Sequence, residues 1–256
     1  MFWKDKIVFI TGASSGIGGE LGRQLSKRGA ILGLLARRKE MLDELSFEIV
    51  QNGGIARSLT ADVTDKISVD AAAESLRREF GRIDILIANA GIGGKPVHAK
   101  DLQPDNFAQV VNINLIGAVN SIASVLPDMF AKNNGQIVGI SSLAGYGGLP
   151  KSAAYCASKA GMSALFESVR VDLLDTSVKV TTVHPGFIKT PLTSGRAAKM
   201  PFLMELSDGV KAITDGIEAG KKNVAFPFPL AQFVRLSRFL PLDLYDYIAS
   251  KNSYRE

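Results

Sequence analysis

The sequence contains few of the residues that form disulfides and metal centres. Its 256 residues include one cysteine, Cys156, and two histidines, His98 and His184. A single cysteine cannot form an intramolecular disulfide, and so few histidines argue against a metal cluster or a histidine-rich metal site. We therefore predict no metal site, and we interpret Cys156 and His184 as packed residues.

Long apolar runs are absent as well. The N-terminal residues lead directly into a short apolar stretch at residues 7–10, which is too short for the core of a signal peptide. No later stretch approaches the roughly 20 apolar residues of a membrane-spanning helix. We therefore expect a soluble protein in a reducing compartment, the cytoplasm.

Charge of one sign is not concentrated in any part of the chain. Thirty basic and 25 acidic residues give a net charge of +5, spread along the sequence rather than gathered in a tail. This mild surplus favours anionic small molecules or surfaces. Since no nucleic-acid-binding motif accompanies it, we expect no nucleic-acid partner.

Short apolar runs alternate with longer helical patterns. The runs typical of strands cover residues 6–10, 31–36, 56–60, 83–88, 136–140 and 179–183. The helical patterns cover residues 16–28, 40–51, 67–80, 106–131 and 155–174. This alternation indicates an α/β fold, with a parallel sheet covered by helices on both faces. No repeat or long linker divides the chain, so we expect a single domain.

A glycine-rich stretch, Thr11-Gly12-Ala13-Ser14-Ser15-Gly16-Ile17-Gly18, follows the first predicted strand and opens the first helix. Glycines let the backbone turn sharply and approach a pyrophosphate, and the free N–H groups of a helix N-terminus favour an anion. The order of strand, glycine loop and helix is the context that a dinucleotide-binding motif requires. The alternative is a glycine turn that only packs the helix against the strand.

The residues after the second and third strands bear on the choice of dinucleotide. The second strand ends at Ala36, which cannot accept hydrogen bonds from a ribose 2′-hydroxyl as an acidic residue would. Arg37, followed by Arg38, can pair with a 2′-phosphate, so the sequence favours NADP; the alternative is a solvated pair of arginines. Asp62 is placed either to meet the adenine amino group or to cap the following helix, a role for which Thr64 and Asp65 compete.

Tyr155 and Lys159 are four residues apart in a helical stretch and therefore share one face of the helix. A tyrosine hydroxyl has a reference pKa of about 10, so proton transfer near neutral pH requires a pKa roughly 3 units lower. A nearby ammonium group and a positively charged ring are neighbours that lower it. Taken alone, the pair could also be a chance occurrence on a solvated helix.

Together these motifs resemble the short-chain dehydrogenase/reductase family of the classical type. The motifs fall in the family's order and spacing between about residue 5 and residue 191: Thr11-Gly12-x-x-x-Gly16-Ile17-Gly18, Asn89-Ala90-Gly91, Asn114-Leu115-Ile116-Gly117, Ser142, Tyr155-x-x-x-Lys159, Pro185-Gly186 and Thr190. The resemblance implies a Rossmann-type, doubly wound parallel sheet of seven strands. It also implies a cofactor-binding and catalytic core over residues 1–191, with a substrate lid and a C-terminal helical extension over residues 192–256.

The resemblance also assigns roles. Tyr155 would be the general acid in carbonyl reduction and the general base in alcohol oxidation, and Lys159 would lower its pKa and bind the nicotinamide ribose. Ser142, thirteen residues before Tyr155, would hold the substrate oxygen in preference to Ser141. Asn114 would bend its helix and support a water that links Lys159 to solvent. The cofactor-binding residues predicted from the motifs and the resemblance together are Gly12, Ser14, Ser15, Gly16, Ile17, Gly18, Arg37, Arg38, Asp62, Val63, Asn89, Ala90, Gly91, Tyr155, Lys159, Pro185, Gly186, Ile188 and Thr190.

The sequence after Thr190 points to the substrate. An apolar, methionine-rich stretch contains Leu192, Met200, Phe202, Leu203 and Met204 and is interrupted by Gly195 and Pro201. This composition fits either a mobile apolar lid over a cofactor cleft or a surface loop with a buried underside. A lid of this kind would favour a hydrophobic substrate.

The C-terminal segment allows two interpretations. Leu230, Phe233, Val234 and Leu240 fall on one face of a predicted helix. This face packs on the domain or on a second subunit, the interpretation that we favour, or it contacts a membrane surface. Residues 230–256 hold four basic and three acidic residues, too small a surplus for strong attraction to anionic lipid.

The leading hypothesis is therefore an NADPH-dependent oxidoreductase that interconverts a carbonyl group and a secondary alcohol on a hydrophobic small molecule. The resemblance further implies a homodimer or homotetramer formed through the helices that contain Asn114 and Tyr155. Two other hypotheses are a non-catalytic regulator that binds NADP(H) with the same fold, and a scaffold docked on a membrane through the C-terminal helix.

Overall fold

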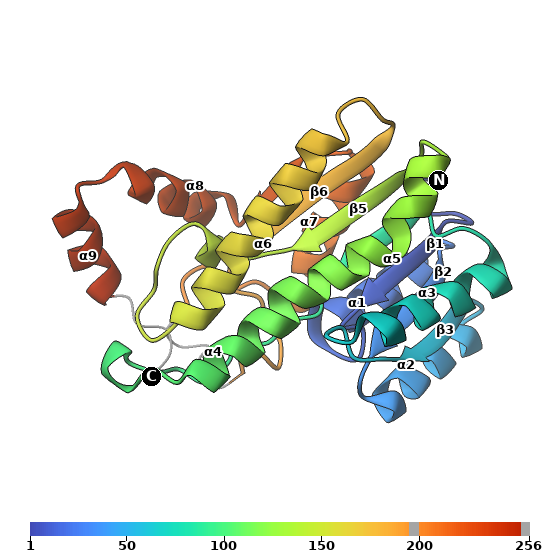
Figure 1. Ribbon diagram of the computed structural model, residues 1–256, viewed down its shortest axis with the longest axis horizontal. Coiled ribbons are helices and arrows are strands. Elements are labelled where there is room, and N and C mark those ends of the chain that lie inside the picture. The colour runs from blue at the N-terminus through green and yellow to red at the C-terminus, as the bar shows by residue number, and fades with distance from the viewer. Residues whose placement is uncertain (195–199, 252–256) are drawn as a thin grey trace.

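One parallel sheet of seven strands organises the chain (Figure 1). The computed structural model describes residues 1–194 and 200–251. The strands lie in the order β3-β2-β1-β4-β5-β6-β7, and every neighbouring pair is parallel. Their bounds are β1 Ile7–Thr11, β2 Ile31–Ala36, β3 Ile55–Thr60, β4 Ile85–Ala88, β5 Gly135–Ile140, β6 Val178–Pro185 and β7 Asn223–Phe226. The predicted α/β fold with a doubly wound seven-stranded sheet is confirmed.

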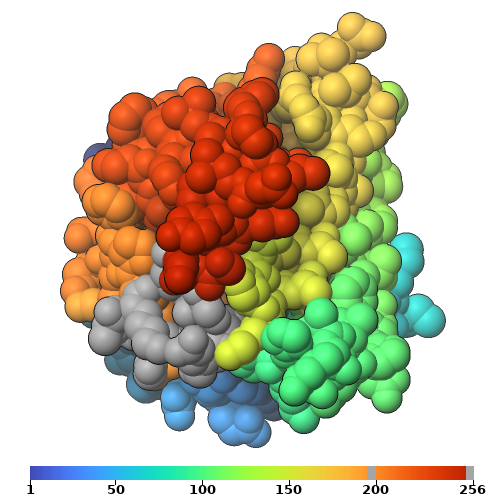
Figure 2. Space-filling view, turned by 90° about the vertical axis from the view of Figure 1, so that its left-hand side faces the viewer, coloured from blue at the N-terminus to red at the C-terminus, as the bar shows by residue number. Residues whose placement is uncertain are grey.

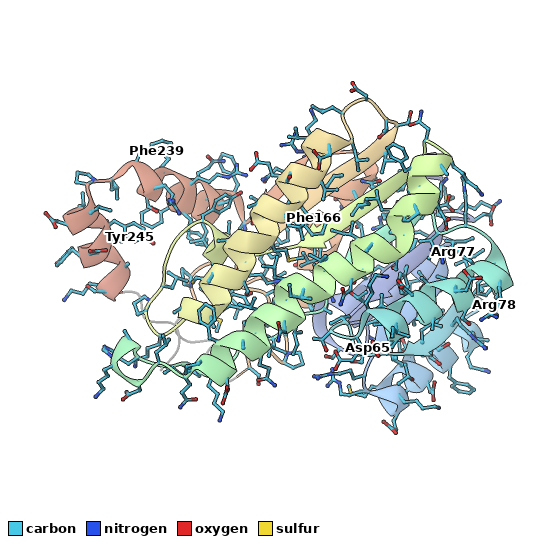
Figure 3. The ribbon with its side chains drawn as sticks, in the orientation of Figure 1. Asp65, Arg77, Arg78, Phe166, Phe239 and Tyr245 are labelled. Atoms are coloured by element: carbon cyan, nitrogen blue, oxygen red, sulfur yellow. The ribbon has the colours of Figure 1, made fainter. Side chains whose placement is uncertain are left out.

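Helices cover both faces of this sheet (Figure 1). One face carries α1 (Gly16–Ser26), α2 (Lys39–Gln51) and α7 (Leu206–Glu218), and the other carries α3 (Lys66–Phe80), α4 (Pro104–Val111), α5 (Gly117–Ala131) and α6 (Ala153–Asp172). Because both faces are covered, all five residues of β1 are buried, and the sequence shows a continuous apolar run instead of alternation. Phe166 of α6, labelled in Figure 3, packs so closely on β5 that a Cβ at Gly139 would lie 2.6 Å from its ring.

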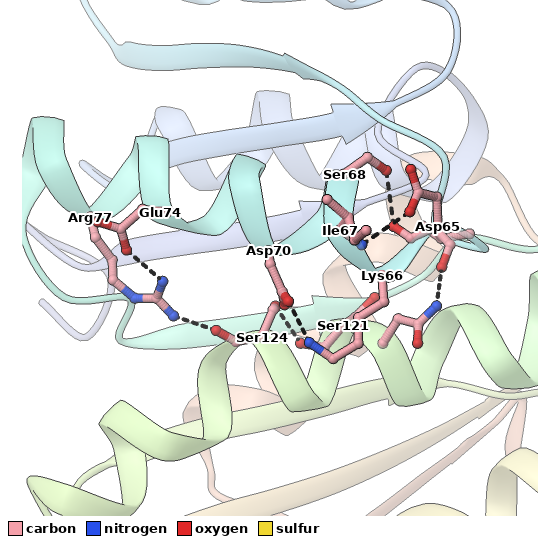
Figure 4. A network of polar contacts seen from close by, with 11 residues as sticks. Asp65, Lys66, Ile67, Ser68, Asp70, Glu74, Arg77, Ser121 and Ser124 are labelled. Atoms are coloured by element: carbon pink, nitrogen blue, oxygen red, sulfur yellow. Dashed lines mark hydrogen bonds and ion pairs between the residues drawn. The ribbon is translucent and has the colours of Figure 1, made fainter.

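Polar contacts fasten α3 to its surroundings (Figure 4). Asp65 caps the helix by accepting a 3.0 Å hydrogen bond from the Ile67 amide. At the other end of α3, Arg77 donates to the Ser124 carbonyl of α5 and pairs with Asp128. Since Asp65 is the N-cap, the helix-capping alternative for Asp62 is wrong.

The long helix predicted at residues 106–131 is interrupted. Helix α4 passes into a π-helical turn, Asn112–Ile116, and then into α5. The π-turn is a local widening of the helix and contains Asn114, the residue at which the family resemblance implied a bend. The 28-residue helical segment Pro104–Ala131 contains an 18-residue window that is apolar enough to span a membrane, so the expectation that no segment approaches this length was wrong. Here 56% of its apolar window is buried inside the fold, as in a core helix.

Two core elements, α7 and β7, come from residues after position 191 for which the sequence patterns defined no element. Strand β7 is the seventh strand that the family resemblance implied without locating it, and it pairs with β6 in the register Val183↔Val224. Ile213 and Ile217 of α7 are fully buried against the same side of the sheet as α1. The part of the chain after residue 191 therefore also contributes to the central core.

The chain ends in a C-terminal extension, defined here as residues 228–251, which projects from one end of the sheet (Figures 1 and 2). It contains α8 (Phe228–Leu236), a 3-10 turn (Ser237–Phe239) and α9 (Leu242–Lys251). Helix α8 ends at Leu236, so the prediction that Leu240 continues its apolar face is wrong. Ala231 is buried in α8, whereas no residue of α9 is buried.

Candidate active site

A cavity of about 740 Å³ lies where the strands end. In a parallel sheet the carboxyl ends of all strands meet at one edge, so the loops after six of the seven strands contribute to its lining. The structure brings together here every predicted site residue except Gly18 and Asn114. The lining contains Gly12, Ser14, Ser15, Gly16, Ile17, Arg37, Arg38, Asp62, Val63, Asn89, Ala90, Gly91, Ser142, Tyr155, Lys159, Pro185, Gly186, Ile188 and Thr190.

The glycine loop has the backbone shape that a pyrophosphate site requires. Gly12 and Gly16 have φ angles of +67° and +55°, a region that other residues rarely adopt. A Cβ at Gly12 would lie 2.7 Å from the Ala90 Cα. The loop leads into the N-terminus of α1, whose first amide groups can bind an anion. These features fit the phosphates of a dinucleotide.

Gly18 lies behind the cavity wall and serves packing. A Cβ at this position would lie 2.4 Å from the Gly12 carbonyl oxygen and 2.6 Å from Nδ2 of Asn89. The third glycine of the motif therefore lets α1 approach the end of β1, which is the role expected of it in dinucleotide-binding loops.

Asn89 joins the ends of β1 and β4 beside this loop. Its Nδ2 donates to the carbonyl oxygens of Thr11 and Gly12 at 2.9 and 3.2 Å. In return, the Thr11 hydroxyl accepts from the Asn89 and Ala90 amides at 3.1 and 3.2 Å. These contacts satisfy the backbone groups at the two strand ends and fix the floor of the cofactor end.

The two arginines after β2 have different partners. Arg37 lies 3.5 Å from an Asp62 carboxylate oxygen, and Asp62 also accepts hydrogen bonds from the amide and hydroxyl of Thr64. Burial alone would raise the pKa of Asp62, but these Thr64 hydrogen bonds and Arg37 lower it. Arg38 instead reaches back to the glycine loop, where its Nη2 donates to the hydroxyls of Ser14 and Ser15 at 2.8 and 2.7 Å. A guanidinium group is thus fixed at the edge of the loop, a contact that the sequence pattern did not predict.

Lys159 is buried behind Tyr155 on α6. Its Nζ lies 6.0 Å from the centre of the Tyr155 ring and donates to the Ile140 carbonyl at 2.7 Å. The side chain is almost inaccessible to solvent, and this burial lowers the pKa of Lys159 to about 8. The ammonium therefore stays mostly protonated at neutral pH and titrates within the working range of an enzyme.

The two adjacent serines after β5 are held differently. Ser141 is buried, and its hydroxyl donates to the Lys159 carbonyl at 2.9 Å. Both serines belong to the cavity lining with Tyr155, but the Ser142 hydroxyl only accepts, from the Ala144 amide at 3.1 Å, and keeps its own hydrogen for another acceptor. Ser142 is therefore the serine suited to hold a substrate oxygen.

Asn114 is fully buried in the π-turn, one layer behind the cavity. Its Oδ1 accepts from the Ile92 amide at 2.7 Å, and its Nδ2 donates to the Ile92 carbonyl and the Ser158 hydroxyl at 3.0 and 2.9 Å. A Cβ at Gly91 would lie 3.2 Å from Asn114 Oδ1 and 3.5 Å from Lys159 Nζ, which places both groups around the same glycine. Asn114 thus ties the long helix to the segment after β4 next to Lys159.

The other end of the cavity is apolar. The predicted lid contributes Leu192 and Met200 to the lining, whereas Phe202 is exposed and Met204 pairs with Ile188 in a parallel bridge. Gly195 lies outside the described residues. The C-terminal extension supplies further lining side chains, namely Leu230, Phe233, Val234, Ser237, Tyr245, Ile248 and Ala249. The sequence indicated the apolar face of residues 230–234, but no spacing signal linked Tyr245 or Ile248 to the cavity.

His184 is packed at the end of β6, as predicted. Its ring stacks on Tyr146 at 4.6 Å, and its Nε2 shares a 3.0 Å hydrogen bond with Ser163. Burial, followed by the charges of Arg235 and Lys159, lowers the pKa of His184 to about 4. The imidazole is therefore neutral at physiological pH.

Comparison with known proteins places these features in a family. The family model described as short chain dehydrogenase matches residues 6–201. A Myxococcus xanthus protein described as an uncharacterized oxidoreductase is 40% identical over 249 residues, which is 96% of this chain and 97% of that protein.

Solved structures show the same fold. A metagenomic short-chain oxidoreductase in complex with NADP is 30% identical, with a TM-score of 0.76 over 88% of this chain and 98% of the other. A short-chain dehydrogenase/reductase from Burkholderia phymatum in complex with NAD has a TM-score of 0.86 at 21% identity, over 93% and 94% of the two chains. The solved relatives thus include both NAD and NADP complexes.

Proposed function

Because this chain belongs to the short-chain dehydrogenase/reductase family of oxidoreductases, we propose that it interconverts a carbonyl group and a secondary alcohol on an apolar small molecule, with NADPH as the reductant. The observation that carries this proposal is the shared cavity. Ser142, Tyr155 and Lys159 line it between the glycine loop at one end and apolar side chains at the other. A dinucleotide and an apolar substrate can therefore meet beside one proton donor.

The proposed chemistry assigns one role to each polar side chain. When bound, the nicotinamide supplies the hydride that a carbonyl carbon receives. Ser142 and Tyr155 donate hydrogen bonds to the carbonyl oxygen as negative charge develops, and Tyr155 delivers the proton that completes the alcohol. The Lys159 ammonium stabilises the phenolate left on Tyr155, and in alcohol oxidation the same groups act in the opposite order.

The preference for NADPH is proposed from the charge at the end of β2. A 2′-phosphate needs fixed cationic donors, and an arginine fork suits it. Arg38 is held on the Ser14 and Ser15 hydroxyls at the cofactor end of the cavity. Ala36, at the end of the strand, offers no carboxylate to a ribose 2′-hydroxyl.

The experiment follows nicotinamide absorbance with NADPH and with NADH over ketones graded from small and polar to long and apolar. We expect turnover with NADPH that rises with substrate apolarity. Tyr155→Phe should lower the rate at least about 100-fold, because it removes the proton donor while keeping the ring. Tyr247→Phe, the same change on exposed α9, is the control. Unchanged reduction in Tyr155→Phe would contradict the mechanism, and NADPH binding without any turnover would favour the regulator hypothesis.

We also propose that the protein is a homo-oligomer joined through α5 and α6. The observation that supports this is the exposure of the large apolar side chains Val119 and Phe130 on α5, Val171 on α6 and Leu174 just after α6. Single exposed apolar side chains are ordinary, but several on two long helices that cover the same face of the sheet fit a symmetric subunit contact. Light scattering after size exclusion should give a dimer or tetramer mass, and Phe130→Asp should shift it towards the monomer.

The outer surface of the C-terminal extension is proposed to contact a lipid surface. Phe239 and Leu242 are 86% and 79% exposed, and Phe233 belongs both to the exposed surface and to the cavity lining. An apolar substrate would then enter the cavity from lipid past Phe233. Because Arg235 and Arg238 turn inward onto Tyr146, binding should resist salt. Flotation with liposomes tests this proposal, and the protein should float with the liposomes at low and at high salt. Flotation that is lost at high salt would contradict the proposal. So would a protein that forms a larger oligomer and does not float.

A further inference from the structure

Three side chains of the C-terminal extension hold a single short segment, Tyr146 to Gly148. Arg235 donates to the Tyr146 hydroxyl through Nη2 at 3.1 Å and through Nε at 3.3 Å. Arg238 donates to the Tyr146 carbonyl, and the Tyr245 hydroxyl donates to the Gly148 carbonyl at 2.7 Å. Figure 3 shows Tyr245 turned toward the domain, whereas Phe239 points away. The segment between these contacts includes Gly147, where a Cβ would lie 2.4 Å from the Tyr245 hydroxyl.

The Tyr146 ring lies between the extension and the sheet. On one side it stacks on His184 of β6 with 4.6 Å between ring centres and 27° between planes. The guanidinium of Arg235 lies 5.4 Å from the ring centre, a cation–π distance. His184 in turn bonds to Ser163, whose hydroxyl donates to the Lys159 carbonyl at 2.8 Å. A continuous set of contacts thus joins Arg235 to the turn of α6 that carries Lys159.

Tyr146 also fixes the segment that begins with Ser142. A 3-10 turn, Leu143–Gly145, joins the two residues. The Tyr146 amide donates to the Leu143 carbonyl at 3.1 Å, and the Gly145 amide donates to the Ser142 carbonyl at 2.9 Å. Because the turn is this short and hydrogen-bonded, displacement of Tyr146 would displace Ser142.

We propose that Tyr146 is a positioning residue that couples docking of the C-terminal extension to the placement of Ser142 in the active site. This inference rests on the proposed function, since it assumes that Ser142 holds the reacting oxygen. Tyr146 is not among the residues that line the cavity, although Ser142 and Gly147 on either side of it are. Its influence on a reaction would therefore pass through Ser142 and not through contact with substrate.

The partners of Arg235 make this contact suitable for a test. Within residues 1–194 and 200–251, Arg235 has no salt bridge with a carboxylate, and its hydrogen bonds go to the Tyr146 hydroxyl and to Oδ1 of Asn223 at 2.6 Å. Replacing Arg235 therefore leaves no buried charge without a partner. The Tyr146 hydroxyl can likewise be removed while the stack on His184 stays in place.

The test is a double-mutant cycle with Tyr146→Phe and Arg235→Met, measured with NADPH and a ketone too small to reach the extension. Each single variant should lower kcat about tenfold, because a hydrogen bond from a charged donor has this order of effect. The KM for NADPH should stay unchanged, and Arg235→Lys should restore part of the lost rate. The loss in the double variant should be clearly smaller than the product of the two single losses, since both substitutions break the Arg235–Tyr146 hydrogen bonds. Tyr247→Phe and Arg57→Met, the same changes at exposed positions, are the controls.

Two kinetic outcomes would overturn the proposal. If kcat for the small ketone is unchanged and only the KM of long ketones rises, the extension is a wall of the cavity and nothing more. If the losses in the double variant multiply, Tyr146 and Arg235 act independently. Thermal unfolding of each variant shows whether a lost rate reflects a lost fold.

A measurement without turnover keeps this inference separate from the proposed function. Amide hydrogen exchange in residues 142–149 should be about tenfold faster in Arg235→Met than in the wild-type protein, with exchange in β1 unchanged. This result would support the coupling even if no ketone were reduced, in which case the proposed function alone would fail. Equal exchange in both proteins would overturn the inference directly.

Discussion

The cofactor end and the C-terminal extension are held in different ways. At the cofactor end, β1 is fully buried, and the loop after it is fixed by close backbone contacts and by Asn89. The extension has no buried residue in α9 and is attached to the loop after β5 through polar contacts on Tyr146 and Gly148. The first region is part of the hydrophobic core, and the second is docked on it.

This difference has a consequence for function. A cofactor of fixed shape needs a site of fixed shape, and close packing gives one because it leaves few alternative arrangements. A segment held by a few exposed hydrogen bonds opens at a lower free energy than the core. We therefore expect the α9 side of the cavity wall to open more readily than the cofactor end.

The largest effect should come from adding one methyl group at the cofactor end. Gly18→Ala places a Cβ 2.4 Å from a backbone oxygen that cannot move aside, so we expect a loss of about 4 kcal/mol in the free energy of unfolding, above the usual range for overpacking. Urea unfolding measures this loss. Gly148→Ala, beside the extension, is the control because its Cβ would meet nothing within 4 Å. Similar losses in both variants would remove the contrast between the two regions.

Lowering the pH should reduce the stability of the protein through His184, which packs on Tyr146 where the C-terminal extension meets the sheet. The pKa of His184 is about 4 in the fold, below the ordinary value of 6.5, because of burial and then the charges of Arg235 and Lys159. Between these two pH values the unfolded chain binds more protons, so stability should fall as the pH falls from 6.5 to 4, by up to about 3 kcal/mol. Urea unfolding at several pH values measures this slope. His184→Gln should flatten it, and an equal slope in that variant would assign the effect to other groups.

Removal of the Arg38 guanidinium should affect the reaction with NADPH more than the reaction with NADH. Arg38→Gln should lower kcat/KM with NADPH about 30-fold, because a charge-assisted contact to phosphate is lost, and should leave the value with NADH nearly unchanged. Initial rates with both cofactors measure this difference. Arg57→Gln on β3 is the matched control. An equal fall with both cofactors would show that Arg38 only supports the glycine loop.

The smallest effect should come from the extension itself. Phe233→Ala removes apolar surface from the cavity lining and should lower kcat/KM for a long apolar ketone about tenfold, with little change for a small one. Phe239→Ala, on the same extension but outside the lining, should change neither value. Rates over the graded ketone panel separate the two variants. Equal effects of both would mean that Phe233 acts only by keeping the extension folded.

Much of this protein could be predicted from local patterns. The apolar runs of β1, β2 and β5 predicted a parallel sheet because strands buried on both faces carry apolar residues throughout. The glycines at positions 12 and 16 predicted a sharp turn, because both adopt positive φ angles that residues with a side chain rarely adopt. The spacing of Tyr155 and Lys159 predicted that they share one face of a helix, because helix geometry places residues four apart one above the other.

Contacts between distant parts of the chain were decided only by the tertiary structure. The partner of Arg38 and the position of β7 each depend on which distant segments lie side by side, and no local spacing records that. The same holds for Tyr146, whose partners His184 and Arg235 are 38 and 89 residues away in the sequence. Local propensity is set by neighbouring residues, whereas packing is set by the whole fold. For this reason the sequence alone determined the sheet, the glycine loop and the shared face of Tyr155 and Lys159, and only the folded chain determined what holds the cavity in shape.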